Sequence, residues 1–160
     1  MKQKQRDLLV LSHLRKHARQ TLTQMSRKTR VPISTLHEML KWHSKNSDWR
    51  YTVLTDFAQM GYQIKAHVLF KVKKEKKEDL RKRLLNNPYV NSLYKVNNGY
   101  DFLSEVYFQK LYDLEEFLEN MQESCSAKAE VHHIMKDLKR EEFMADPEVA
   151  RNVLDPAMAR

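Results

Sequence analysis

Residues 90–108, with the sequence VNSLYKVNNGYDFLSEVYF, are the stretch on which the predicted fold depends. Two β-prone segments, residues 90–96 and 102–108, flank the sequence NNG of residues 97–99. Asn and Gly tolerate the left-handed backbone that a tight turn between two strands requires. We therefore predict that this stretch is an antiparallel β-hairpin.

Regular patterns continue on both sides of this hairpin. Before it, residues 64–72 alternate between apolar and charged side chains as a strand does, and the charged run of residues 73–85 predicts an exposed helix. After it, an amphipathic helix of residues 111–121 precedes a final strand at 130–136. The order β-α-β-β-α-β is that of a ferredoxin-like domain. Its helices would cover one face of the sheet, and the uncovered face leads us to expect a homodimer.

The N-terminal third of the chain has helical rather than strand periodicity. Apolar residues at three- and four-residue steps predict helices over about residues 5–18 and 33–44. Between them, Thr21 and Gln24 form the sequence of a capping box, which predicts the start of a short second helix. Pro32 then favours a break followed by a new first turn. Three short helices with a tight turn before the last predict a winged-type helix-turn-helix, so the whole chain belongs to the α+β class.

The net charge of +8 is concentrated in this helical third. Residues 1–50 contain 12 Lys and Arg against 3 Asp and Glu, a net charge of +9, whereas residues 51–160 contain 17 against 18, a net charge of −1. A basic module joined to a neutral one is typical of a protein that binds a polyanion through one domain.

Helix-turn-helix proteins place their last helix in the major groove of DNA. Polar residues on the outward face of the predicted third helix are therefore candidates for base and phosphate contacts, and basic residues in the preceding helix and turn are candidates for phosphate contacts. The candidate DNA-binding residues are Arg27, Lys28, Arg30, Ser34, Thr35, His37, Glu38 and Lys41.

Several other classes of protein are disfavoured by the composition. The single cysteine, Cys125, cannot form an internal disulfide, and neither His37 nor His43 has a partner His or Cys four residues away on the same helix face. We therefore predict no metal and no cofactor. No apolar run approaches the ~20 residues that cross a bilayer, and the polar N-terminus has no signal-peptide core, so we expect no membrane association and a cytoplasmic protein.

The order of elements and the sequence VNNGYDFL of residues 96–103 resemble the Lrp/AsnC family of feast/famine transcription regulators. The resemblance covers roughly residues 5–143. It implies a dimer, or a tetramer or octamer, that binds pseudopalindromic double-stranded DNA and responds to an amino acid or related small molecule near the hairpin turn. The effector candidates that it implies are Asn98, Gly99, Tyr100 and Asp101.

The resemblance and the patterns together divide the chain into four segments. These are a helix-turn-helix domain at 1–50, a linker strand and hinge at 51–62, a βαββαβ effector-binding and oligomerisation domain at 63–143, and a C-terminal tail at 144–160.

Our leading hypothesis is a sequence-specific transcription regulator that is not an enzyme. One alternative is an architectural protein that coats DNA without an effector. A second is an enzyme similar to the siroheme decarboxylases, which share the two-part architecture. His132 and His133 are the obvious catalytic candidates for that reading, but adjacent strand residues point to opposite faces, which disfavours joint chemistry.

Overall fold

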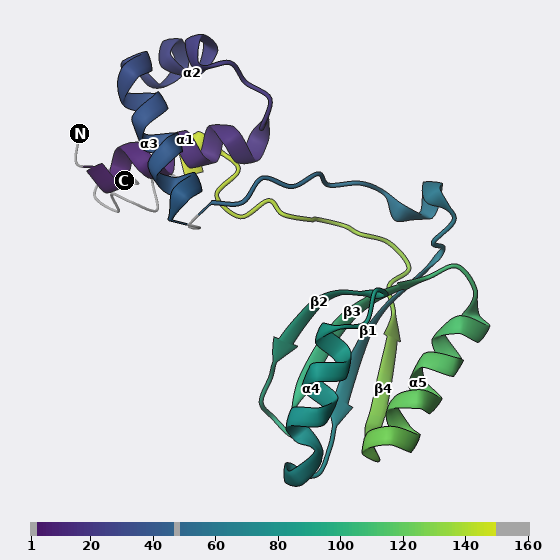
Figure 1. Cartoon of the computed structure of the whole chain (residues 1–160). Coiled ribbons are helices and arrows are strands. Elements are labelled where there is room, and N and C mark those ends of the chain that lie inside the picture. Colours follow the sequence, from purple (N-terminus) through teal and green to yellow (C-terminus); the bar gives the residue numbers. More distant parts are fainter. Residues whose placement is uncertain (1–2, 47–48, 150–160) are drawn as a thin grey trace. The chain divides into compact units, whose positions relative to one another are not determined.

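The predicted hairpin is present in the computed structural model, which describes residues 3–46 and 49–149 (Figure 1). Its strands are β2 (Val90–Lys95) and β3 (Phe102–Phe108), which pair antiparallel. The turn between them uses a left-handed backbone at Asn98, with φ of 62°, and at Gly99, with φ of 95°. Asn and Gly adopt this conformation at lower cost than other residues, which is why the sequence NNG closes the hairpin.

The hairpin belongs to a four-stranded antiparallel sheet with the strand order β2-β3-β1-β4. β1 (Ile64–Lys71) lies between β3 and β4 (Lys128–His133), so the first and last strands of the domain are neighbours. This is the arrangement of a split βαβ fold, and the predicted ferredoxin-like architecture is confirmed.

Two helices, α4 (Lys77–Leu85) and α5 (Leu111–Cys125), lie on the same face of this sheet (Figure 1). A short 3-10 helix, Lys74–Lys76, precedes α4. Alternate residues of the strands point toward the helices and are fully buried there, among them Val68, Phe70 and Val106. Burial of each such side chain contributes about 1.5–3 kcal/mol to stability.

The N-terminal segment forms three helices, α1 (Gln3–Lys16), α2 (Leu22–Thr29) and α3 (Ile33–Lys45). The predicted capping box opens α2, because the Gln24 amide donates to Thr21 Oγ1 at 3.2 Å and the Thr21 amide donates to Gln24 Oε1 at 3.1 Å. The turn before α3 depends on a left-handed backbone at Arg30, which caps α2.

The helices enclose a second core that is separate from that of the sheet. Its buried apolar residues are Val10, Leu14, Met25, Val31, Leu36 and Met39. α1 ends two residues earlier than predicted, at Lys16, and leaves Ala18 exposed. The described residues before β1 contain no β-strand, so this part of the helix-turn-helix includes no β-hairpin wing.

The predicted linker strand within residues 51–62 is a point of difference. Residues 51–56 have no regular structure, and Asp56 instead caps a 3-10 helix, Phe57–Met60. A strand needs a neighbouring strand for its backbone hydrogen bonds, and none of the described strands pairs with residues 51–56. Consequently Tyr51 and Val53 are exposed rather than packed.

The chain forms two compact units, and the second of them ends before the predicted domain boundary at residue 143. Leu54–Asp137 form the sheet unit, whereas the described residues from Leu138 onward group with the helices. In that group Arg15 of α1 contacts Glu141, and Ala145 is buried. The rest of the predicted tail, residues 150–160, lies outside the described residues. In the described part of the chain, no helix combines the length and apolar composition needed to cross a membrane.

Candidate functional site

The outward face of α3 presents most of the predicted DNA-binding residues. Ser34, His37, Glu38 and Lys41 are exposed and Thr35 is half-buried. The opposite face of the helix is held in the core by buried Leu36, Met39 and His43. The helix is therefore anchored on one side and open to a partner along the other.

The predicted phosphate contacts lie beside this face, at the end of α2 and in the turn. Arg27, Lys28 and Arg30 are all exposed. Lys28 Nζ donates to Gln20 Oε1 at 3.0 Å. Within residues 3–46 and 49–149, no carboxylate forms an ion pair with Arg27, Arg30 or Lys41. Their positive charge is therefore not neutralised within the described part of the molecule.

One exposed aromatic residue on α3 escaped the sequence-based prediction. The side chain of Trp42 is 57% exposed, and its ring meets His43 edge to face with centroids 4.9 Å apart. His43 in turn stacks on Trp49 at 3.9 Å, inside the helical unit. The sequence signal for this residue is a large aromatic side chain at a position of the predicted helix that faces away from its core.

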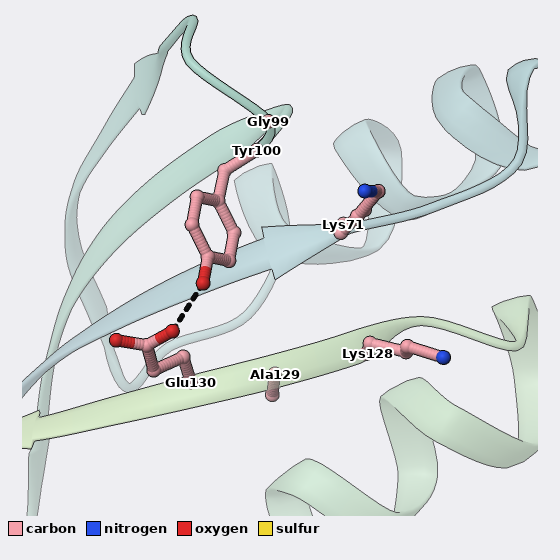
Figure 2. Close-up of a pocket in the computed structure, with 6 residues that line it drawn as sticks. All are labelled: Lys71, Gly99, Tyr100, Lys128, Ala129 and Glu130. Carbon is pink, nitrogen blue, oxygen red and sulfur yellow. Dashed lines mark hydrogen bonds between the residues drawn. The ribbon is translucent and has the colours of Figure 1, made fainter.

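The hairpin turn lines a hollow of about 300 Å³ on the sheet unit (Figure 2). Of the four effector candidates, Gly99 and Tyr100 line it, together with Lys71 at the end of β1 and Lys128, Ala129 and Glu130 at the start of β4. The Tyr100 hydroxyl points at Glu130 and donates a hydrogen bond to its carboxylate (Figure 2). The turn and the first residues of β4 are thus joined across the hollow.

Glu130 is the anionic group of this pocket. The hydrogen bond from Tyr100 lowers the pKa of Glu130, and His132, whose Nε2 lies 2.9 Å from Glu130 Oε1, lowers it further. The same hydrogen bond raises the pKa of Tyr100, because it would be lost if the phenol ionised. At neutral pH the pair is therefore a carboxylate and a neutral phenol.

The other two effector candidates, Asn98 and Asp101, do not line the hollow. Asn98 supplies the first left-handed residue of the turn. Asp101 accepts a hydrogen bond from the Val72 amide at 2.9 Å and pairs with Lys77 Nζ at 2.5 Å. Although burial favours protonation of Asp101, these two contacts outweigh it and lower its pKa. Asp101 thereby ties the hairpin to the end of β1.

Sequence reasoning did not identify Lys71, Lys128 and Glu130 as residues of this pocket. They lie about 30 residues to either side of the turn in the sequence, and only the pairing of β1 with β3 and with β4 brings them to it. Their positions could not be inferred from the hairpin alone.

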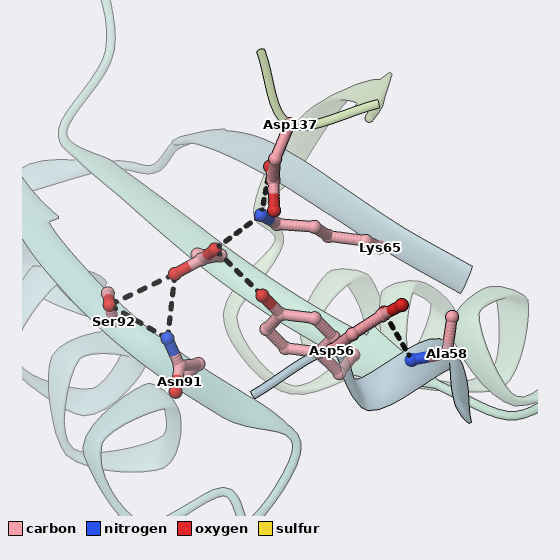
Figure 3. A network of polar contacts seen from close by, with 8 residues as sticks. Asp56, Ala58, Lys65, Asn91, Ser92 and Asp137 are labelled. Carbon is pink, nitrogen blue, oxygen red and sulfur yellow. Dashed lines mark hydrogen bonds and ion pairs between the residues drawn. The ribbon is translucent and has the colours of Figure 1, made fainter. Parts of the chain in front are cut away.

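The sheet face away from the helices carries a second polar cluster (Figure 3). Glu105 lies at its centre, accepts hydrogen bonds from Asn91 at 2.7 Å and from the Tyr107 hydroxyl at 3.1 Å, and pairs with Lys65 at 3.2 Å. Lys65 also contacts Asp137 at 2.6 Å. Burial opposes the charge on Glu105, but these contacts lower its pKa. The cluster holds β1, β2 and β3 to the segment that follows β4.

The histidines of β4 are separated as strand geometry requires. His132 pairs with His67, which lies on the open face with Lys65, whereas His133 pairs with buried Ala66 on the helix side. In the described ranges no group of three His, Cys, Asp or Glu side chains is arranged to hold a metal ion.

Comparison with known proteins relates the sheet unit to one family of domains and the chain to several regulators. Residues 65–143 match the model of the Lrp/AsnC ligand binding domain. The HTH-type transcriptional regulator FL11 of Pyrococcus furiosus is 25% identical over 114 residues, which cover 71% of this chain and 76% of FL11. Its counterpart in Pyrococcus horikoshii matches to the same extent.

Solved structures of transcriptional regulators share the fold of this chain. The regulator NMB0573 of Neisseria meningitidis has a TM-score of 0.77 at 18% identity, covering 88% of this chain and 93% of its own. LrpC of Bacillus subtilis has a TM-score of 0.77 at 19% identity, covering 87% and 99%. Residues 65–143 therefore match an Lrp/AsnC ligand binding domain, while the chain is similar in sequence to the FL11 transcriptional regulators and shares the fold of the solved regulators.

Proposed function

We propose that this regulator binds double-stranded DNA sequence-specifically through α3 and that an amino acid or related small molecule in the hairpin pocket controls this binding. The observation that carries the DNA-binding part is the exposed face of α3, flanked by Arg27, Arg30 and Lys41. Because no described carboxylate neutralises these cations, phosphates can take that place. Ser34, Thr35, His37 and Glu38 are then positioned to read base edges, and Lys28 adds a phosphate contact.

The pocket at the hairpin supports the effector part of the proposal. It offers both signs of charge, Lys71 and Lys128 as cations and Glu130 as the anion, and an amino acid carries both a carboxylate and an ammonium. The Neisseria meningitidis regulator was solved as a complex with L-Met, and a Mycobacterium tuberculosis feast or famine regulatory protein was solved with L-methionine. These complexes make an amino acid the first class of ligand to test.

We further propose a homodimer formed through the open sheet face, with a tetramer or octamer as a higher assembly. That face carries Leu69, Leu103 and Tyr94, which are paired with one another across β1, β3 and β2. Each of them alternates along its strand with residues whose side chains point toward the helices. A sheet stabilises itself by burying such a face against another layer. Two copies would also present two α3 helices, as recognition of a pseudopalindromic site requires.

The assignment of segments follows from these roles. We propose DNA binding for residues 1–50, a hinge for 51–62, and effector binding and oligomerisation for 63–143. We propose that this regulator acts in the cytoplasm. We also propose that it has no catalytic activity, since His132 and His133 lie on opposite faces of the sheet and cannot act together.

Selection of bound fragments from random DNA, followed by footprinting at physiological salt, tests this function. We expect discrete protected half-sites and a change in affinity when an amino acid of the right class is added. Continuous protection of any DNA, unaffected by amino acids, would instead support the architectural alternative. Loss of binding in Lys41→Gln, with wild-type binding in the exposed variant Lys82→Gln on α4, would locate the interface.

A further inference from the structure

Exposed lysines gather at the end of the sheet that carries the hairpin turn. The sequence KVKKEKK of residues 71–77 has five lysines and one glutamate, a net charge of +4, although residues 51–160 as a whole carry −1. It runs from the last residue of β1 to the first residue of α4. Lys95 of β2 lies level with the end of β1, because Lys95 and Phe70 both pair with Phe102 of β3. We call four exposed residues at this end the lysine cluster: Lys73, Lys74, Lys76 and Lys95.

The lysine cluster and its neighbours are placed unfavourably for the fold itself. Lys73, Lys74 and Lys76 come immediately before α4, and no side chain caps this helix at Lys76. The N-terminus of a helix carries the positive end of its dipole, so cations are disfavoured there. Beside them, Lys71 of β1 lies directly opposite Lys128 of β4, and like charges at such positions weaken the pairing of two strands. This concentration of positive charge therefore points to a partner that supplies negative charge.

The carboxylates beside the hairpin turn do not neutralise the lysine cluster. Asp101 pairs with Lys77 at 2.5 Å and also attracts Lys71. Glu130 accepts the hydrogen bond from the Tyr100 hydroxyl. Figure 2 shows the ammonium groups of both lysines that line the hollow directed away from Glu130. These two acids are thus held by groups outside the cluster.

The charge at this end of the sheet stays positive when the other carboxylates are counted. In the first turn of α4, Glu78 pairs with Arg81 and Asp79 pairs with Arg83, so these pairs are neutral. Among residues 3–46 and 49–149, no carboxylate forms an ion pair with the lysine cluster. The cluster together with Lys71, Lys77 and Lys128 makes seven cations against four further carboxylates, Glu75, Asp101, Glu123 and Glu130, a net charge of +3.

We infer that the lysine cluster is a second DNA-binding surface, which contacts the phosphate backbone of the DNA that α3 reads. Lys95 and the lysines that follow β1 are separated by β3, so they lie roughly 10 Å apart at ~4.8 Å per strand. One small anion does not span that distance, whereas successive phosphates of a polyanion do. Exposed lysines suit this role, because phosphate contacts gain affinity from the release of counterions and carry no sequence information. The inference rests on the proposed function, since it adds a contact to the same DNA complex.

The salt dependence of DNA binding by the full chain tests the inference. The cluster variant carries Lys73→Gln, Lys74→Gln and Lys76→Gln, and the selected site lies within a duplex of about 60 base pairs, well beyond two half-sites one helical turn apart. Fluorescence anisotropy at several salt concentrations measures the affinity. We expect the cluster variant to bind about tenfold more weakly at low salt. The slope of log affinity against log salt should fall by about 2 to 3, because each phosphate contact contributes ~0.9.

A control variant removes the same number of charges elsewhere on the sheet unit. It carries Lys82→Gln, Lys110→Gln and Lys136→Gln, three exposed lysines outside the cluster, and should retain the wild-type affinity and slope. Equal losses in the two triple variants would reduce the effect to net charge and overturn the surface. Urea denaturation followed by circular dichroism should show the cluster variant to be at least as stable as wild type, because its lysines oppose the dipole of α4. Unfolding then does not account for its weaker binding.

The contrary outcomes separate the inference from the function on which it rests. An unchanged slope in the cluster variant, together with a loss of binding in Lys41→Gln, would overturn the second surface and leave DNA binding through α3 in place. Failure of the full chain to bind any selected DNA fragment would overturn both.

Discussion

The helical unit and the sheet unit use their basic residues differently. In the helical unit, Arg27, Arg30 and Lys41 are exposed without an ion pair to a described carboxylate. In the sheet unit, Lys65 and Lys77 are bound by carboxylates at 2.5–3.2 Å and hold strands and turn together. The first arrangement leaves charge available to a polyanion, whereas the second neutralises charge within the fold.

The largest expected effect is the loss of stability when a core residue is truncated, and it tests whether the two units fold independently. Phe108 is buried in the sheet core and Leu36 in the helical core, and truncation of such residues to Ala costs about 2–5 kcal/mol. Both tryptophans, Trp42 and Trp49, belong to the helical unit, so their fluorescence reports on that unit alone. We expect Phe108→Ala to shift the urea transition seen by circular dichroism and to leave the tryptophan transition in place.

Leu36→Ala is the matched variant for the other unit. It should shift the tryptophan transition strongly. If the transitions seen by circular dichroism and by tryptophan fluorescence shift together in both variants, the chain unfolds as one cooperative body. The two units are then not independent in their folding.

The second largest effect is expected on DNA affinity, and it concerns the basic residues of the helical unit that have no ion pair to a described carboxylate. The double variant Arg27→Gln and Lys41→Gln should weaken binding to all DNA sequences by about 2 kcal/mol and reduce the slope of log affinity against log salt by ~1.8, because each phosphate contact contributes ~0.9. Fluorescence anisotropy at several salt concentrations measures both quantities. An unchanged slope would remove these residues from the phosphate contacts, and Lys82→Gln provides the control for net charge.

The two regions also differ in how far their sequence predicts them. The proposed DNA-binding surface lies within residues 27–41, so helical periodicity alone identifies its exposed face. The pocket combines residues 71, 99–100 and 128–130, and only the hairpin part has a local signature. The partners from β1 and β4 depend on strand pairing between distant segments, which a periodic pattern does not specify.

Features that depend on tertiary contacts are the hardest to derive from the sequence. A β-prone sequence at 51–55 forms no strand because it lacks a neighbouring strand in the described structure. Residues 138–149 group with the helical unit through contacts such as that of Arg15 with Glu141, and no local sequence pattern predicts these contacts. In contrast, Phe102–Phe108 and the capping box at Thr21 are local features, and both agree with the structure.

The third prediction concerns pH and the paired charges of the sheet unit. Because its contacts lower the pKa of Glu105 below 4.5 in the folded state, ionised Glu105 stabilises the fold at pH values above 4.5. This stability is lost as the pH falls through the lowered pKa. Glu105→Gln should cost about 1–2 kcal/mol at pH 7 and should flatten the fall in stability below pH 4.5.

Urea denaturation followed by circular dichroism between pH 3 and pH 7 measures this dependence. An equally steep fall in the variant would assign the pH dependence to other carboxylates. Lys65 has a raised pKa, so its contribution is present below 10.5 and is lost only as the pH rises above that value. Lys65 therefore stays charged between pH 3 and pH 7 and does not contribute to the fall in stability at low pH.

The smallest effect tests to which unit the C-terminal segment belongs. Arg15 donates to the Glu141 backbone carbonyl at 2.8 Å and to its carboxylate at 3.0 Å, at a partly exposed position. Exposed pairs of this kind contribute at most about 1 kcal/mol. We expect Arg15→Gln to lower the tryptophan-detected stability slightly and Glu141→Gln to lower it less, because the latter keeps the bond to the carbonyl. A double-mutant cycle isolates the coupling between the two side chains. A coupling that appears in circular dichroism but not in tryptophan fluorescence would attach residues 138–149 to the sheet unit, and the boundary between the two units would then move from Asp137 to the end of that segment.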